Sequence, residues 1–313
     1  MDGIDTGAAE TEGQADRERT TPPRIRPGWL RALLLLLIAF AAAETAAVIL
    51  VVPLLGLAGI DAAGLESVEF MLLGEVAVVG ILALAVGGFC RYVDRRSLVS
   101  LGLSWHAPFW RHGLYGILWG GGIVTAVFVA LWLLGALRIV SVSFRGEALL
   151  LHLALFALVA FGEELVVRGY VLRNLMDSMS PMKALAVSAV PFALGHASNP
   201  NASVAGVAII ALAGLLLGVY YVHRRNLWFP IGLHLAWNCF QGAVYGSRVS
   251  GLEMEGILGI EMTGPPIVTG GDFGFEASVV TGAALLAATV LLHGIYRRAP
   301  GVVPPGPAAS PGA

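Results

Sequence analysis

The amino-acid sequence predicts an all-α membrane protein, a polytopic bundle of about eight transmembrane helices. Of its 313 residues, 57% are hydrophobic and only 13% are charged, and the mean hydropathy is +0.79. Soluble domains carry about a quarter charged residues. Apolar segments recur along the chain, and most are close to the roughly 20 residues that a helix needs to cross a bilayer. These observations indicate a chain embedded in lipid.

The apolar segments are separated by polar loops, and most are long enough to cross a membrane. The fifth is shorter than the others and ends at the sequence GHASNPN. We expect this segment to stop inside the membrane or to continue irregularly against protein, where its backbone polar groups can still be satisfied. The eight segments cover roughly residues 32–56, 70–90, 113–137, 148–167, 183–196, 204–222, 228–245 and 278–296.

The two ends of the chain differ from the apolar middle. We expect disordered tails at residues 1–28 and 299–313, which lack hydrophobic periodicity, and a helical domain at residues 29–298. The first apolar segment follows a long polar lead and exceeds a signal-peptide core, so we interpret it as an uncleaved anchor. The net charge of −2 gives no indication of nucleic-acid binding, and two cysteines are too few for a disulfide framework.

Basic residues gather in alternate loops. The N-terminal flank, the loops near 91–111, 168–183 and 224–225, and the pair at 297–298 hold most of the arginines. The intervening loops are acidic or nearly neutral. The positive-inside rule therefore predicts a multi-pass protein of the cell membrane with both termini in the cytoplasm.

Several ionisable or polar side chains fall inside the apolar segments. An ionisable residue at the centre of a bilayer costs at least ~2.5 kcal/mol, so each is a candidate for function. No motif surrounds Glu44 or Glu75, and we favour structural hydrogen bonding for both. We favour a packing or interfacial role for His152, which lies near the start of its segment. The full set is Glu44, Glu75, His152, Glu163, Glu164, His196, His234 and Asn238.

The spacing of these residues arranges them on helix faces. Glu164 and Arg168 are four residues apart and can form an ion pair, which leaves Glu163, about 100° round the helix, free to face another group. His196 is four residues from Phe192, and His234 is four residues from Asn238. Three helices thus each present a polar stripe, and the interior of the bundle is where such stripes meet at low cost. A purely structural role for the Glu164–Arg168 pair remains the alternative.

A carboxylate, two imidazoles and an amide can hydrolyse an amide bond in two ways. A carboxylate in a low-dielectric site suits a general base, because burial raises the pKa of such a group. Imidazoles can hold a divalent metal whose bound water becomes nucleophilic near neutral pH. Alternatively, histidine and asparagine can donate hydrogen bonds to a developing oxyanion while glutamate and the other histidine activate water.

Three motifs in this order resemble a known family. GEELVVRG matches Glu-Glu-x-x-x-Arg, PFALGH matches Phe-x-x-x-His, and HLAWN matches His-x-x-x-Asn. They are similar to the motifs of the CPBP family of intramembrane endopeptidases, the group of CAAX prenyl protease 2 and the bacteriocin-processing (Abi) proteins. The resemblance covers about residues 148–245, which would form the protease core.

The resemblance implies a role for each motif residue. Glu163 would activate water with the help of His196, and Glu164 and Arg168 would be a supporting pair that orients their helix. His234 and Asn238 would complete a metal site or form the oxyanion hole. The family is described both as metalloproteases and as glutamate proteases, which leaves two mechanisms open. In the first, Glu163, His196 and His234 would hold a divalent metal, zinc above all. Asparagine is a poor zinc ligand, and the other groups suit either.

The expected substrate is a membrane-associated peptide or protein, and nothing in the sequence specifies a prenyl group on it. The alternative is a non-proteolytic membrane protein, either a proton-coupled transporter or a peptide-binding or immunity protein. The His-Glu-x-x-His motif of zincins is absent. We expect the site toward the cytoplasmic half of the membrane, and we favour a solvated connection over a flexible lid for the Gly-rich, acidic loop 246–277.

Overall fold

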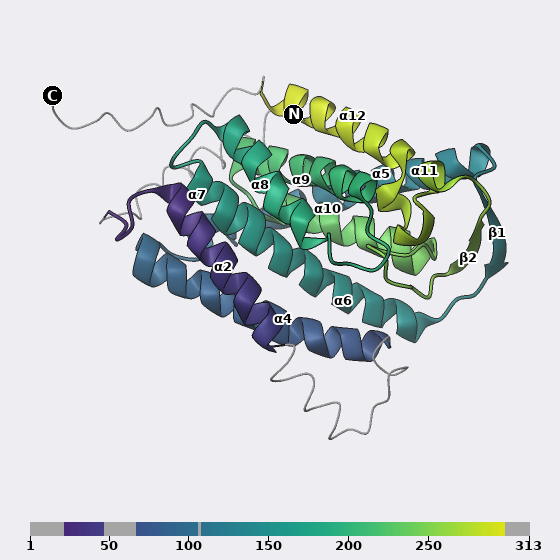
Figure 1. Ribbon diagram of the computed structural model, residues 1–313, viewed down its shortest axis with the longest axis horizontal. Helices are drawn as coiled ribbons and strands as arrows, with labels where there is room; N and C mark the ends of the chain where they lie inside the picture. The colour runs from purple at the N-terminus through teal and green to yellow at the C-terminus, as the bar shows by residue number, and fades with distance from the viewer. Residues whose placement is uncertain (1–21, 47–66, 106–107, 298–313) are drawn as a thin grey trace.

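The computed structural model describes residues 22–46, 67–105 and 108–297. Its helices lie side by side along the long axis of the molecule, and a two-stranded sheet lies at one end (Figure 1). Residues 22–27 are not helical, and the rest of both predicted tails, apart from Gly28, lies outside the described residues. The prediction of a polytopic helical bundle is confirmed.

Each of the eight predicted apolar segments contains a helix. Within the described residues, five helices are long and apolar enough to cross a membrane: Val68–Asp94, Phe109–Leu133, Gly146–Leu175, Val204–Arg224 and Val279–Tyr296. The number of eight spans stays a prediction. The main helices are α2 (Gly28–Ala46), α4 (Val68–Gly88), α5 (Phe109–Leu133), α6 (Gly146–Glu164), α8 (Pro181–Gly195), α9 (Val204–Arg224), α10 (Trp228–Asn238) and α12 (Val279–Tyr296).

Three of these helices continue as wider π-helical turns: η3 (Phe89–Asp94) after α4, η5 (Leu165–Leu172) after α6 and η6 (Cys239–Val244) after α10. The short helix α7 (Arg173–Leu175) follows η5, so the element that begins with α6 spans 30 residues, or about 45 Å at 1.5 Å per residue. It therefore runs well past its predicted end at residue 167, and Glu163 lies near its middle.

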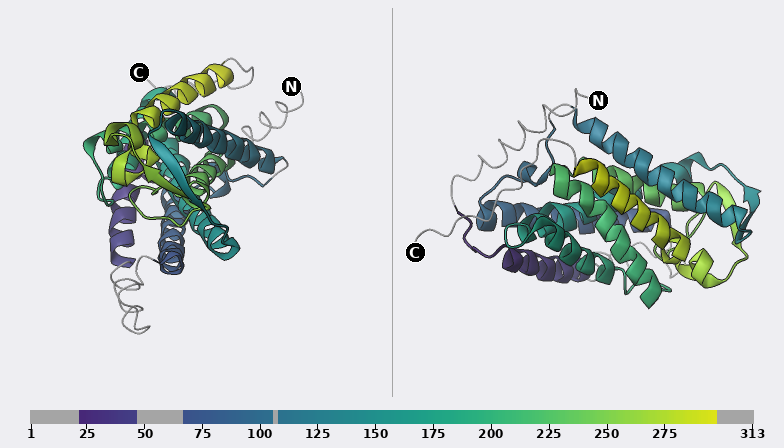
Figure 2. Two further views of the ribbon diagram at one scale, coloured as in Figure 1. Left: turned by 90° about the vertical axis from the view of Figure 1, so that its right-hand side faces the viewer. Right: turned by 90° about the horizontal axis from the view of Figure 1, so that it is seen from above.

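A small sheet that the sequence analysis missed lies at the end of the bundle opposite α7 (Figure 1). Strand β1 (Leu137–Val142) pairs with β2 (Leu258–Met262) in antiparallel register, with an irregularity between Ile139 and Ser141. The left view of Figure 2 looks onto this end.

Beyond β2, loop 246–277 contains α11 (Pro266–Thr269) and two 3₁₀ turns, Gly271–Phe273 and Phe275–Ala277. Phe273 and Phe275 are fully buried. The preferred interpretation of a solvated connection is therefore wrong.

Helices α5 and α10 pack closely through small residues. A Cβ atom at Gly116 would lie 2.0 Å from the Phe229 carbonyl oxygen, and one at Gly232 would lie 2.2 Å from that of Gly113. Small residues let helix backbones approach in this way in membrane proteins, where packing rather than the hydrophobic effect drives association. The contact fixes α10, which carries His234 and Asn238, against α5.

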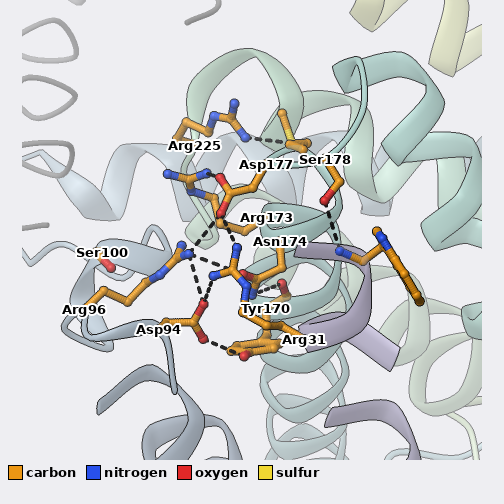
Figure 3. A network of polar contacts seen from close by, with 12 residues as sticks. Arg31, Asp94, Arg96, Ser100, Tyr170, Arg173, Asn174, Asp177, Ser178 and Arg225 are labelled. Carbon is orange, nitrogen blue, oxygen red and sulfur yellow. Dashed lines mark hydrogen bonds and ion pairs between the residues drawn. The ribbon is translucent and has the colours of Figure 1, made fainter. Parts of the chain in front are cut away.

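A buried ionic cluster, named here the Arg31 cluster, connects the N-terminal end of α2 to η3 and α7 (Figure 3). Arg31 pairs with Asp94 and, at 2.9 Å, with Asp177. Arg96 pairs with the same two aspartates at 3.2 and 3.3 Å. The Tyr170 hydroxyl donates to Asp94 at 2.5 Å. The cluster comprises Arg31, Asp94, Arg96, Tyr170, Asn174 and Asp177.

Candidate active site

The three motif segments meet in the middle of the bundle. Glu163 lies near the end of α6, His196 directly follows α8, and His234 lies in α10. The Oε2 atom of Glu163 lies 4.0 Å from Nε2 of His196 and 4.0 Å from Nε2 of His234. One carboxylate oxygen therefore faces two imidazoles that come from two different helices.

The second glutamate of the motif is held in a fully buried ion pair. Nη1 of Arg168 donates to Oε1 of Glu164 at 2.8 Å, and the two side chains are 1% and 0% exposed. Nη2 of Arg168 donates to the carbonyl oxygen of Gly214 in α9 at 3.1 Å. The Arg168 guanidinium also lies over the Phe192 ring in α8, 4.1 Å from its centroid. The pair thus ties the α6 segment to α8 and α9, and it also reaches α10 through His234.

Both histidines are oriented by a hydrogen bond at Nδ1. Nδ1 of His196 lies 2.8 Å from the Phe192 carbonyl oxygen, and Nδ1 of His234 lies 3.0 Å from Oε1 of Glu164. The Phe192 carbonyl oxygen can only accept a hydrogen bond, and so can the carboxylate of an ionised Glu164. We therefore assign the proton to Nδ1 in both rings. In the neutral imidazole Nε2 then carries a lone pair, and both lone pairs lie on the side of Glu163.

The Oε2 atom of Glu163 is buried and has no hydrogen-bond partner within the described residues. With the two Nε2 atoms it forms a group of three acceptors. A separation of 4.0 Å is too long for a direct hydrogen bond between Oε2 of Glu163 and either imidazole. A molecule that donates protons, such as water, has the chemistry that complements them.

These residues line a cavity of about 430 Å³ whose walls are mostly apolar. Asn238, which is 5% exposed, is part of the wall, and no hydrogen bond to its side chain is found within the described residues. The polar residues in the wall are Glu75, Glu163, His196, Asn199, His234, Asn238, Ser250, Glu276 and Thr281.

The cavity extends from the middle of the bundle toward the end that carries loop 246–277. Its wall includes Met71 and Glu75 near the start of α4, Thr281 near the start of α12, and Ser250 in the loop. The arginine-rich loops lie at the other ends of α4 and α12. The expected position toward the cytoplasmic half of the membrane stays a prediction, and the cavity extends toward the end of the bundle opposite the arginine-rich loops.

Sequence reasoning missed Glu276 and underrated Glu75. Glu276 is 7% exposed, and its carboxylate accepts from the Ser250 backbone N–H at 2.5 Å and from the Ser250 hydroxyl at 3.2 Å. Burial raises the pKa of the Glu276 carboxyl. Its position in a loop of acidic residues gave no signal, whereas Glu75 was visible as an ionisable residue inside an apolar segment.

The two remaining candidates lie outside this group. His152 is buried, and its Nδ1 lies 2.7 Å from the carbonyl oxygen of Ala148 on its own helix. It is not part of the cavity wall, and its helix-internal bond agrees with a packing role. The side chain of Glu44 lies outside the described ones.

The described residues do not fit a metal ion as they stand. No set of three or more His, Cys, Asp or Glu side chains within them is arranged to hold one. The nearest set is Glu163, His196 and His234, with O–N separations of 4.0 Å. Neighbouring ligands of tetrahedral zinc lie roughly 3.3 Å apart, because the bonds to zinc are about 2.0–2.2 Å long.

Comparison with known proteins adds the family. Residues 145–240 match the family model of type II CAAX prenyl endopeptidase Rce1-like proteins. The match contains all three motifs and confirms the resemblance to the CPBP family, although it covers under a third of the chain. No curated protein and no solved structure matches the chain.

Proposed function

We propose, on the premise that residues 145–240 place this protein among the CAAX-type endopeptidases, that it is an intramembrane endopeptidase with Glu163 as its general base. The substrate would be a membrane-associated peptide or protein. The observation that carries the proposal is the approach of two imidazole Nε2 atoms to one unpartnered Glu163 oxygen in the wall of a cavity. The partly apolar, partly polar wall suits a peptide that leaves the lipid to be cleaved.

The proposed first step uses water held between Glu163 and His196. Glu163 takes a proton from this water while the water oxygen forms a bond to the carbonyl carbon of the substrate. Oε2 has no competing donor within the described residues, so it is free to accept the proton. The lone pair on Nε2 of His196 accepts the other water proton as a hydrogen bond and fixes the direction of attack.

The carbonyl oxygen gains negative charge in this step. Asn238 would donate a side-chain N–H to it, since this amide lies in the cavity wall without a hydrogen-bond partner among the described residues. When the C–N bond breaks, Glu163 returns its proton to the leaving amine. Glu164 and Arg168 take no part in bond changes, and they position His234 and the α6 segment.

The first test is the substitution Glu163→Gln, assayed with internally quenched peptides anchored in proteoliposomes. Loss of a general base typically lowers a rate by about 10²–10⁴-fold, and we expect a loss in this range. Glu147→Gln is the matched control, because Glu147 is exposed in the first turn of the same helix. Equal rates in Glu163→Gln and the wild type would refute the proposal. A transporter or binding protein would show no cleavage in either.

Metal content is the second test, since the sequence left a divalent metal, zinc above all, as one of two open mechanisms. The separations between Glu163, His196 and His234 lead us to expect no stoichiometric metal in folded, purified protein. The measurement is elemental analysis of the wild type beside His196→Ala and His234→Ala. About one zinc ion per chain, lost in either variant, would show that these three side chains close around a metal.

A further inference from the structure

The cavity wall carries carboxyl groups that have no basic side chain beside them in the wall. It includes three carboxylates, those of Glu75, Glu163 and Glu276, and no lysine or arginine of the described residues. Buried charges in proteins are normally paired, because an isolated charge is expensive to remove from water. Arg168 lies nearby, but its ion pair is with Glu164.

Glu276 is the clearest case among the three. More than nine-tenths of it is buried, and within the described residues its carboxylate accepts only from the backbone and hydroxyl of Ser250. Arg248, two residues from Ser250, pairs instead with Asp272 and Glu253, at 2.5 Å each. His196 and His234 line the same cavity as Glu276, and in their neutral form neither ring supplies a positive charge.

Glu75 is a second carboxyl group of the cavity wall without a cationic partner among the described residues. Its side chain comes from α4, it is half-buried, and no hydrogen bond or ion pair to it is found within the described residues. It lines the same cavity as Glu163, so negative charges on both carboxylates would repel each other. A positive charge that entered the cavity would relieve this repulsion and would meet carboxylates from α4, α6 and the segment before α12.

Two further side chains indicate that the cavity takes a polar ligand. Thr281 is fully buried in the wall, and its hydroxyl has no hydrogen-bond partner within the described residues. Asn238 also lines the wall, and no hydrogen bond to its side chain is found within the described residues. Buried polar groups without partners are rare in folded proteins, and a peptide backbone carries donors and acceptors that satisfy both.

We propose that the substrate of this site is an apolar peptide segment with one lysine or arginine near the scissile bond, and that Glu276 and Glu75 select the cation. This inference rests on the proposed function and names its substrate class. Charges interact strongly where water is excluded. Carboxylates in the wall therefore attract a lysine or arginine side chain and repel a free C-terminal carboxylate. The site is therefore better suited to an internal peptide bond than to one a few residues from a C-terminus.

The test uses membrane-anchored, internally quenched peptides that share one apolar segment. One series carries a single lysine at successive positions, the second carries glutamine at the same positions, and each is made with a C-terminal amide or a free acid. At the best position we expect kcat/KM to be about tenfold or more higher for lysine than for glutamine. We expect Glu276→Gln to lower the ratio of the two kcat/KM values, lysine over glutamine, toward one, and circular dichroism of the purified variant reports that it is folded. Glu75→Gln is the second variant.

Equilibrium binding of the same peptides to the wild type, measured by fluorescence anisotropy, separates the two proposals. Preferential binding of the lysine peptide without any cleavage would refute the protease and keep the cation site. Cleavage without a lysine preference would refute the cation site and keep the protease. An equal loss for both peptides in Glu276→Gln would show that Glu276 only anchors Ser250, and it would overturn the inference. A preference for the free acid would do the same.

Discussion

Two buried polar clusters of this protein use the same kinds of side chain and differ in how they are paired. In the Arg31 cluster, Asp94 accepts from Arg31, Arg96 and Tyr170, and Asp177 accepts from both arginines as well. In the cavity wall, none of Glu75, Glu163 and Glu276 pairs with a lysine or arginine of the described residues, and the neighbouring Arg168 pairs with Glu164. The Arg31 cluster holds charges of both signs in close contact, whereas the cavity has a surplus of carboxylates.

The difference separates a structural from a functional use of buried charge. A paired cluster fixes the elements that contribute to it. Here these are α2, η3, η5 and α7, of which α2 and η3 are distant in sequence from the other two. An unpaired group has unused hydrogen-bonding capacity that a substrate or a water molecule can take up. We therefore expect substitutions in the Arg31 cluster to lower stability, and substitutions in the cavity to lower activity at nearly constant stability.

The largest effect on stability is expected for Asp94→Asn. The substitution removes one of the two carboxylates that pair with the buried guanidinium groups of Arg31 and Arg96. Breaking a buried pair in this way typically costs about 3–5 kcal/mol. The measurement is the free energy of unfolding in detergent, followed by circular dichroism during denaturant titration. Peptide cleavage by the fraction that stays folded should be unchanged.

Asp272→Asn is the matched control. Asp272 pairs with Arg248, but its side chain is 77% exposed, so the same chemical change should cost less than about 1 kcal/mol. Similar losses at Asp94 and Asp272 would contradict the structural role of the Arg31 cluster.

Much of the helical arrangement could be predicted from the sequence, because lipid makes strong demands on it. The apolar segments followed from hydropathy, and the Glu164–Arg168 pair followed from the four-residue spacing of a helix. The convergence of Glu163, His196 and His234 was expected, since polar stripes in lipid can only face each other at low cost. The catalytic roles of these residues stay predictions.

The parts that could not be predicted depend on contacts between distant segments. Arg31 and Arg96 read as loop charges that set orientation, yet both are buried against Asp94 and Asp177. Glu276 reached the cavity only because loop 246–277 folds over it, and no local pattern signals that. The strands β1 and β2 are more than a hundred residues apart, so neither formed a recognisable hairpin.

A smaller effect, on rate rather than stability, is expected for Asn238→Ala. Removal of one donor to an oxyanion typically lowers kcat by about 10²–10³-fold. The amide has no partner to leave unsatisfied within the described residues, so the free energy of unfolding should stay close to that of the wild type. Steady-state kinetics in proteoliposomes, beside the unfolding measurement used for Asp94, tests both. A large loss of stability with normal kcat would show that Asn238 has a structural role, as the residues of the Arg31 cluster do.

The smallest effect is expected for the exposed ion pair between Arg138 and Glu261, which lie opposite each other in β1 and β2. Their side chains are 64% and 52% exposed, so water and salt screen the 2.8 Å contact. A double-mutant cycle of Arg138→Gln and Glu261→Gln should give a coupling of about 0.2–1 kcal/mol that fades at high salt. A larger coupling that resists salt would mean that this end of the bundle is shielded from solvent. The Arg31 cluster and the Arg138–Glu261 pair would then both be shielded from water, and exposure to solvent would no longer distinguish them.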